Sequence, residues 1–292
     1  MFSLTKILLP VDFSERCVRA IRRALPVLAN HFNSEITVLH VIPTYSLFGP
    51  AKMGMTLPPD LVVKVKAQAQ QHLDDFVKKA LSDRHAMAVL LEGDPARTIA
   101  AFADSAKSDL IMMPTHGYGT FRKLLLGSVT SKVLHDANCP VWTSAHLDTL
   151  PSPEAPLSLG HILCAIDLGV HSAPTLSWAH QLAAEYGAKL TLVHVVASLD
   201  PRTEGYYFAP EWQKFVIDKA MEDIDKLQQS IHVKADVHIE VGDVSKSVSS
   251  AAQNLRADLL VIGRGVTVGT LGRFRTHASA IIRQSPCPVV SL

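Results

Sequence analysis

The residues most suggestive of chemistry lie in the stretch 109–142, DLIMMPTHGYGTFRKLLLGSVTSKVLHDANCPVW. A short apolar run is followed by a loop with glycines and a basic pair, and then by Gly127 and Ser128, where a helical pattern begins. Backbone amides at the start of a helix, beside a small hydroxyl residue, attract an anion such as phosphate. The same Ser128 could instead cap the helix without any ligand. Both interpretations stay open until the stretch is placed within the whole chain.

The composition excludes several classes of protein. With 292 residues and 48% hydrophobic content, the chain is typical of a soluble globular protein with about two domains. The 28 basic residues nearly balance the 27 acidic ones, so no broad field favours nucleic acid or an anionic membrane as a partner. Four cysteines lie far apart without a metal-binding spacing: Cys17, Cys139, Cys164 and Cys287. We expect free core thiols, no bound metal and a cytoplasmic location.

The chain repeats itself. ILLPVDFS (7–14) matches ILCAIDLG (162–169), and EITVLHVIP (35–43) matches KLTLVHVVA (189–197). Further along, Gly93-Asp94 matches Gly242-Asp243, Asp109 matches Asp258, and NCPVWT matches PCPVVS, all in the same order. The sequence therefore predicts two copies of one domain, 1–147 and 158–292, joined by a Pro/Ser-rich linker.

Within each copy, apolar runs alternate with helical patterns. In the first copy, strands are expected at 7–11, 36–41, 87–91, 110–113 and 141–143, mostly apolar enough to be buried on both faces. The apolar residues between them recur at helical spacing, as in Cys17, Ile21, Leu25 and Leu28. This alternation predicts an α/β fold in which helices cover both faces of a doubly wound parallel sheet. Such sheets bind ligands outside the carboxyl ends of their strands, so Asp12 and the loop after Met113 are expected to meet in one crevice.

These residues resemble the universal stress protein family, and the chain looks like a tandem member. Nucleotide-binding members carry G-x2-G-x9-G-[ST] after the fourth strand and an aspartate at the end of the first. Here the pattern falls on Pro114, Gly117, Gly127 and Ser128, so proline replaces the first glycine. The resemblance implies a five-stranded parallel sheet in the order 3-2-1-4-5, and ATP, with or without Mg²⁺, as the ligand.

The family's roles carry over position by position. By resemblance, Asp12 contacts the adenosine and Val41 lines the adenine pocket. The nucleotide-binding set that the resemblance implies is Pro10, Val11, Asp12, Val41, Met113, Thr115, Gly117, Gly127, Ser128, Val129 and Thr130. Asp12 could alternatively cap the following helix, and Gly117 could be a plain turn residue. Pro114 lacks an N–H, so a ligand contact through that amide is excluded.

The second copy departs from the pattern. Gly263 stands where the first copy has Pro114, and Arg275-Thr276 stand where Gly127-Ser128 are. A side chain as large as arginine occupies the space of a phosphate, which predicts a degenerate site. Asp167, which matches Asp12, would then cap a helix or bond to its own loop. An alternative is that Arg264, Arg273 and Arg275 bind an anion from a new direction.

Three classes of function follow. The first is a stress-response regulator that binds ATP in the first domain without dedicated catalytic machinery, since the motifs that accompany common enzymes are absent from the sequence. The second is a slow ATPase or autophosphorylating protein, and the third is a nucleotide-free interaction scaffold. The last strands of the two copies are expected to pair as an intramolecular pseudo-dimer that can dimerise again, and client proteins are unknown. His40 and His194 recur at equivalent strand positions, which predicts a shared structural environment.

Overall fold

The protein consists of two compact units. The structure, a computed structural model, describes residues 2–43, 58–82, 84–114, 126–144, 157–196, 209–264 and 273–292. One unit comprises residues 3–157 and the other residues 158–292. The two units contain the same succession of helices and strands, and each is described by itself below.

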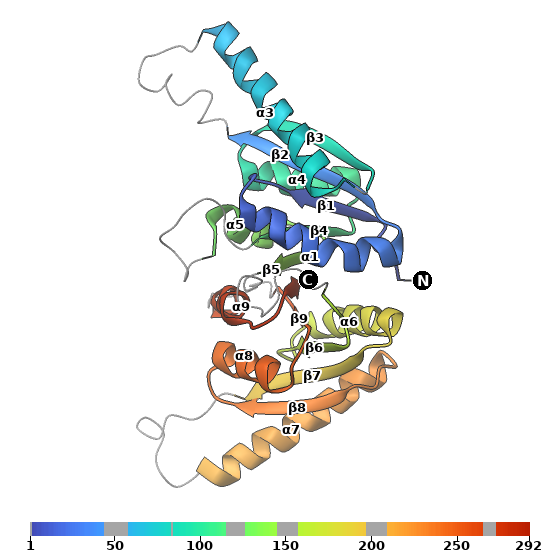
Figure 1. Cartoon of the computed structure of the whole chain (residues 1–292). Helices are drawn as coiled ribbons and strands as arrows, with labels where there is room; N and C mark the ends of the chain where they lie inside the picture. The colour runs from blue at the N-terminus through green and yellow to red at the C-terminus, as the bar shows by residue number, and fades with distance from the viewer. Residues whose placement is uncertain are drawn as a thin grey trace. The chain divides into compact units, whose positions relative to one another are not determined.

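The first unit is a parallel sheet covered by helices on both faces. Its strands are β1 (Lys6–Pro10), β2 (Glu35–Pro43), β3 (Ala86–Gly93), β4 (Leu110–Pro114) and β5 (Val141–Ser144), in the order β3-β2-β1-β4-β5. Its helices are α1 (Glu15–Phe32), α3 (Pro59–Ala80), α4 (Pro95–Ala106) and α5 (Ser128–Asp136). Helices α1 and α3 pack together on one face of the sheet, and α4 and α5 pack together on the other (Figure 1).

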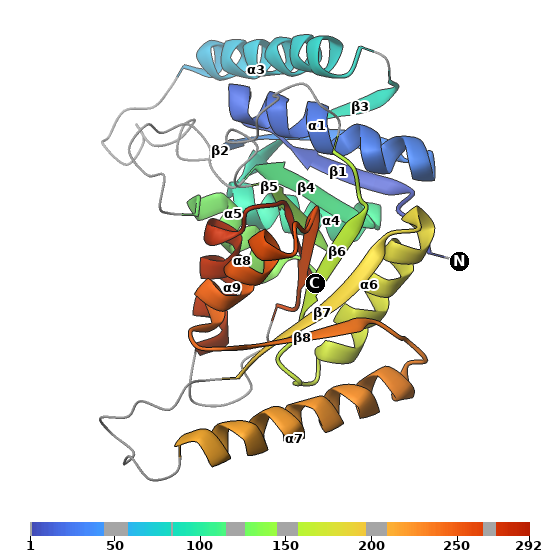
Figure 2. The same ribbon diagram turned by 60° about the horizontal axis from the view of Figure 1, so that its bottom comes forward.

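The second unit repeats this architecture. Its strands are β6 (His161–Ala165), β7 (Lys189–Val196), β8 (Asp236–Val241), β9 (Leu259–Ile262) and β10 (Val289–Ser291), in the order β8-β7-β6-β9-β10. The helices are α6 (Ser172–Tyr186), α7 (Ala209–Ser230), α8 (Val244–Asn254) and α9 (Arg273–Gln284). Helices α8 and α9 lie side by side on one face of the sheet (Figure 2). The predicted tandem α/β fold is confirmed.

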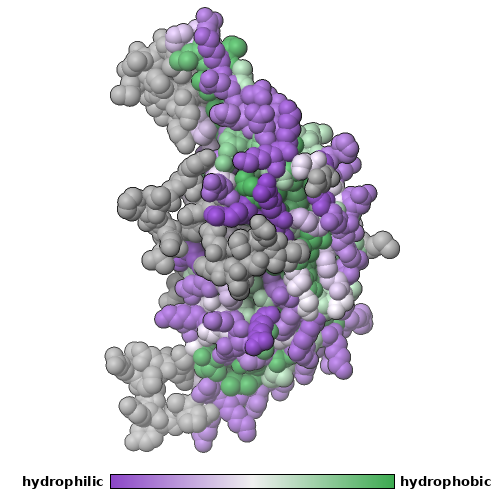
Figure 3. Space-filling model, in the orientation of Figure 1, coloured by the Kyte–Doolittle hydropathy of each residue, from purple (hydrophilic) through white to green (hydrophobic). Residues whose placement is uncertain are grey.

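The core of the first unit follows the apolar pattern of the sequence in α1 and departs from it in β3 and α3. The side chains of α1 that recur at helical spacing are all buried: Cys17, Ala20, Ile21, Ala24, Leu25 and Leu28. The expectation of burial on both faces is wrong for β3, where Met87 is 65% exposed and no residue is fully buried. The first turn of α3 also departs, since Leu61 is 42% exposed. Figure 3 shows hydrophobic residues interspersed with hydrophilic ones along this helix.

Several residues that recur in the two copies have the same structural role. Asp109 accepts hydrogen bonds from the backbone N–H of Lys6 (2.9 Å) and the hydroxyl of Thr5 (2.9 Å), and so ties the start of β1 to β4. Asp258 accepts from the backbone N–H groups of Gly160 (2.8 Å) and His161 (2.9 Å) at the corresponding place. These aspartates therefore hold the sheets together at the strand ends away from the crevices.

The matched Gly-Asp pairs start the third helix of each unit. Gly93 and Gly242 have φ of +151° and +142°, a region that side-chain-bearing residues rarely adopt. Asp94 and Asp243 are the N-caps of α4 and α8. Each carboxylate accepts a hydrogen bond from a backbone N–H group, that of Arg97 for Asp94 and that of Lys246 for Asp243. These bonds hold the pKa of each aspartate below its usual value.

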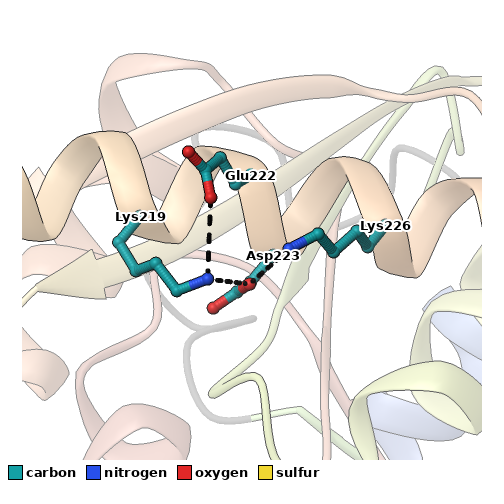
Figure 4. A network of polar contacts seen from close by, with 4 residues as sticks. All are labelled: Lys219, Glu222, Asp223 and Lys226. Atoms are coloured by element: carbon teal, nitrogen blue, oxygen red, sulfur yellow. Dashed lines mark hydrogen bonds and ion pairs between the residues drawn. The ribbon is translucent and has the colours of Figure 1, made fainter.

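Helix α7 carries a charged surface. Lys219 Nζ lies 2.8 Å from Asp223 Oδ1 and 3.6 Å from Glu222 Oε2, and Lys226 Nζ lies 3.6 Å from the same Asp223 oxygen (Figure 4). Pairs three and four residues apart stabilise a solvated helix modestly. Their arrangement is that of a water-facing helix surface.

The cysteines are free thiols, as predicted. Cys17, Cys164 and Cys287 are buried. Burial raises the pKa of Cys17 and Cys164 to about 12, so these thiols stay protonated near neutral pH. Among the described residues, no helix is both long and apolar enough to cross a membrane.

Candidate functional site

The first strand of each unit is followed, two residues after its end, by an aspartate that organises the adjoining loop. Asp12 Oδ1 accepts a hydrogen bond from the backbone N–H of Ser14 (3.0 Å), two residues further on. The N-cap of α1 is Ser14, whose hydroxyl accepts from the N–H of Cys17 (3.2 Å). The alternative in which Asp12 caps the helix is therefore wrong. Asp12 instead stabilises a turn that presents its carboxylate at the carboxyl end of β1.

A histidine joins the ends of the first two strands in each unit. His40 Nδ1 lies 2.8 Å from the carbonyl oxygen of Val11, and His194 Nδ1 lies 2.9 Å from that of Ile166. A carbonyl can only accept, so Nδ1 carries the proton in both rings. The predicted shared environment is confirmed, and it is a structural one. In the first unit, this bond fixes His40, and the buried Val41 is the next residue along β2.

The start of α5 has no side-chain cap. Its N-cap is Gly127, and the first helical hydrogen bond runs from the N–H of Ser131 to the Gly127 carbonyl (2.8 Å). Ser128 is the first residue of the helix and is exposed. The alternative in which Ser128 is the N-cap is therefore wrong. The first amides of a helix need partners from outside it, and Gly127 has no side chain to supply one.

Thr130, a member of the predicted nucleotide-binding set, makes a structural hydrogen bond. It is buried, and its hydroxyl donates to the carbonyl oxygen of Pro114 (3.1 Å). The bond ties the end of β4 to the first turn of α5. Pro114 is the last residue of β4, where its missing N–H breaks no described hydrogen bond of the sheet. Thr130 therefore positions the helix start beside the strand end.

Part of the predicted site lies outside the described residues. Thr115 and Gly117 are in the segment 115–125, as is the basic pair of the loop that the sequence analysis pointed out. The remaining residues of the predicted set are described: Pro10, Val11, Asp12, Val41, Met113, Gly127, Ser128, Val129 and Thr130. They lie at the ends of β1, β2 and β4 and in the first turn of α5.

The corresponding crevice of the second unit is a cavity of about 480 Å³. Seven positions of the predicted set have counterparts in its lining, namely Ala165, Ile166, Asp167, Val195, Ile262, His277 and Ala278. They correspond in turn to Pro10, Val11, Asp12, Val41, Met113, Val129 and Thr130. The repeat thus indicates that the residues predicted from the first copy belong to one crevice, and that the second copy retains an open one.

Asp167 stabilises its own loop, one of the two roles that the sequence left open. Its Oδ1 accepts from the backbone N–H of Gly169 (2.9 Å) and the hydroxyl of Ser172 (3.1 Å). The N-cap position of α6 is occupied by His171, so Asp167 does not cap the helix. Leu168 has a positive φ of 61°, matching the 64° of Phe13, so both units use the same turn.

Helix α9 begins further upstream than its counterpart α5. It starts at Arg273, so Arg275 lies within the first turn where Gly127 is the N-cap of α5. The side chains of Arg273 and Arg275 lie outside the described residues. The backbone N–H of Arg264 donates to the carbonyl of Leu292 (2.5 Å). The anion-binding alternative for these arginines stays a prediction.

Sequence reasoning missed several residues that line the second cavity. Ser172, Thr175 and His171 come from the start of α6, and Val244 and Val248 come from α8. A signal for them was present in the repeat, because Cys17 and Ala20 of the first copy correspond to Ser172 and Thr175. Polar residues that replace apolar ones on a buried helix face indicate a polar space beside it.

The fold and these sites define the class of protein: a tandem pair of doubly wound α/β domains, with the candidate site residues of each at the carboxyl ends of its strands. The family model "Universal stress protein family" matches residues 3–144 and 159–291. The chain therefore belongs to the universal stress protein family, with two copies of its domain.

Individual relatives agree with this assignment. A universal stress protein of Methanocaldococcus jannaschii is 34% identical over 140 residues, which are 47% of this chain and 79% of the relative. One from Mycolicibacterium smegmatis is 26% identical over 212 residues, or 71% of this chain and 68% of the relative. A crystal structure of a universal stress protein from Archaeoglobus fulgidus has the same fold, with a TM-score of 0.69 at 24% identity, over 99% of this chain and 96% of the other.

Proposed function

We propose that the first unit binds ATP, with or without Mg²⁺, and that the protein is an ATP-binding stress-response regulator. The observation that carries the proposal is the start of α5. Gly127 is an N-cap without a side chain, and no side-chain hydrogen bond caps the helix. Amides in this position attract phosphate, and the exposed hydroxyl of Ser128 adjoins them.

The other described residues of the crevice fit the remainder of the nucleotide. The carboxylate of Asp12 keeps one oxygen, Oδ2, without a donor among the described residues, so it can accept a ribose or base hydrogen bond. Val41 and Met113, both buried, supply apolar contacts at the strand ends for a flat heterocycle. The residues of this crevice would hold and orient ATP, and a partner could distinguish the protein with bound ATP from the protein without it.

We further propose that the bound nucleotide is a signal and not a substrate for rapid turnover. The motifs that accompany common enzymes are absent from the sequence. The His40 ring has a structural role, because its Nδ1–H donates to the Val11 carbonyl and so joins β1 to β2. A slow ATPase would be recognised by release of inorganic phosphate from the intact chain, at a rate that follows the protein concentration.

A calorimetric titration of the intact chain with ATP tests the proposal. About one ATP per chain is expected, because Gly127 leaves room at the helix start and Arg275 occupies the corresponding position. Native mass spectrometry of gently purified protein provides an independent reading of the same stoichiometry. Absence of any nucleotide in both measurements would favour the scaffold, and two equal sites would show that the second copy is not degenerate towards ATP.

Location and assembly are proposals of the same kind. Free thiols and the family assignment fit a cytoplasmic protein. The pairing of the last strands of the two copies as a pseudo-dimer, further dimerisation, and client proteins all stay predictions. Size-exclusion chromatography with light scattering, with and without ATP, would measure the oligomeric state.

A further inference from the structure

The cavity of the second unit has apolar walls and a small group of polar side chains. The apolar walls come from β6, β7 and β9 and from helices α8 and α9, and include Val193, Val195, Val248, Ile262 and Ile281. The polar lining residues are Asp167, His171, Ser172, Thr175, His194 and His277. Mostly apolar walls with a few polar groups are typical of small-molecule sites, and a volume of about 480 Å³ lies within their usual range.

The hydroxyl protons of the lining are donated to the protein. Ser172, which is 2% exposed, donates to Asp167 Oδ1 (3.1 Å). Thr175, also 2% exposed, donates to the carbonyl oxygen of His171 (2.7 Å). A hydroxyl that has donated its one proton can only accept further bonds. Both oxygens are therefore acceptors towards a ligand in the cavity.

His194, the histidine that joins the strands, also presents an acceptor to the cavity. The proton on His194 Nδ1 is held by the Ile166 carbonyl, 2.9 Å away. In the neutral ring, Nε2 is then an acceptor. Asp167 adds a carboxylate whose Oδ2 has no donor among the described residues. Asp167, Ser172, Thr175 and His194 thus present acceptors, with one negative charge among them.

Space beside these acceptors depends on Gly263. A Cβ atom at this position would lie 3.1 Å from Thr175 Oγ1, a distance tighter than nine in ten real Cβ contacts. The first copy has Pro114 here and Ala20 in place of Thr175. The second copy therefore combines a position without a side chain, Gly263, with an added buried oxygen, a change in ligand chemistry and not only a loss of phosphate contacts.

We propose that the second unit binds a neutral molecule of nucleoside size whose polar groups are hydrogen-bond donors, and that it discriminates against nucleoside triphosphates. The first crevice shares the aspartate and the histidine, so the discrimination comes from Ser172 and Thr175, two further acceptors that leave phosphate oxygens without donors. A neutral heterocycle with amino and hydroxyl donors satisfies the same groups. The inference rests on the proposed function only in assigning ATP to the first unit.

Adenosine is the probe for the test. The intact chain is first saturated with ATP and then titrated with adenosine by calorimetry. We expect one further molecule per chain. In the Asp167→Asn variant, the amide oxygen keeps the bonds from Gly169 and Ser172, and the amide nitrogen replaces the free acceptor by a donor. Adenosine affinity should fall about 10- to 100-fold, the range for losing a hydrogen bond to a charged group.

Two further variants separate binding from folding. Asp225→Asn removes an exposed carboxylate from α7, outside the cavity lining, and should leave adenosine affinity at the parent value. Gly263→Val fills the space beside Thr175 and should abolish adenosine binding while the affinity for ATP at the first unit is kept. Retained ATP binding shows that the Gly263→Val chain is folded.

The outcomes distinguish this inference from the proposed function. It is overturned if ATP-saturated protein binds no adenosine, if Asp167→Asn binds as tightly as the parent, or if the second unit binds ATP as well as the first. If the chain binds no ATP but binds one adenosine in a manner sensitive to Asp167→Asn, the inference stands and the proposed function fails. If the chain binds one ATP and no adenosine, the proposed function stands and the inference fails.

Discussion

The crevices of the two units share their supports and differ in their lining. In both, an aspartate stabilises the loop after the first strand, and a histidine Nδ1 donates to the carbonyl before that aspartate. The lining differs where a ligand would lie: Val129 corresponds to His277, Ala20 to Thr175 and Pro114 to Gly263. The difference shows that the positions that build the crevice can be kept while the positions that choose its ligand change.

A degenerate motif is therefore not the same as a lost site. Arg275-Thr276 breaks the phosphate pattern of the second copy. The same copy nevertheless has a cavity of about 480 Å³ with buried hydroxyls in its lining. Buried polar groups are costly unless they have partners, and here the hydroxyls are oriented by protein acceptors.

The largest expected effect comes from making the first crevice resemble the second at the helix start. Gly127→Arg should weaken ATP binding more than about 100-fold, because the side chain occupies the phosphate position and several charged hydrogen bonds are lost together. Calorimetry on the intact chain measures the loss. Arg275→Gly should leave the stoichiometry at about one ATP, because the acceptor lining of the second cavity is unchanged.

The control for added charge is Gln68→Arg on the exposed surface of α3. It introduces the same side chain away from the crevice and should bind ATP as the parent does. If Gln68→Arg and Gly127→Arg lose affinity equally, the effect arises from net charge and the assignment of the phosphate position is wrong.

An intermediate effect is expected where the two units are alike. Asp94→Ala and Asp243→Ala each remove an N-cap and should each lower the free energy of unfolding by about 1 kcal/mol. The folded-state pKa of both aspartates is lowered, so the stabilisation is present above the unfolded pKa of about 3.9 and is lost as pH falls through the folded value. The variants should therefore approach the parent's stability in acid.

Hydrogen exchange of the intact chain assigns each loss to its unit, with faster exchange in α4 for Asp94→Ala and in α8 for Asp243→Ala. Asp218→Ala on the exposed surface of α7 is the control and should change stability by less than about 0.5 kcal/mol. Equal and pH-independent losses in all three variants would contradict a capping role.

The sequence predicted the scaffold well because the signals for it are local and occur twice. Apolar runs placed every strand of the first unit to within about two residues, and the paired Gly-Asp residues mark the helix starts that the structure shows. Hydrophobic periodicity and turn chemistry act over a few residues, so one chain can reveal them.

The crevice was harder to predict because its shape depends on contacts between distant segments. The capping alternatives for Asp12 and Ser128 were compatible with the sequence, and only the hydrogen bonds exclude them. The shape of the cavity in the second unit depends on Gly263 and Thr175 together, because a side chain at 263 would crowd Thr175. The two residues are 88 positions apart in the chain (263 − 175). The motif includes the position of Gly263 but not that of Thr175, so it does not reveal this pair.

The smallest expected effect concerns Pro114, the position at which the first crevice departs from the family pattern and the second has a glycine. Pro114→Gly restores an N–H at the end of β4 and keeps the carbonyl that accepts from Thr130. If a ligand uses that N–H, ATP should bind more tightly, by at most about 10-fold, since one neutral hydrogen bond contributes about 0.5–1.5 kcal/mol. The unfolded chain becomes more flexible, so the free energy of unfolding should fall by up to about 1 kcal/mol. Calorimetry and urea unfolding measure the two quantities separately. Weaker ATP binding in a folded Pro114→Gly protein would mean that proline holds the strand exit in the binding geometry, and that its rigidity matters more than the missing donor.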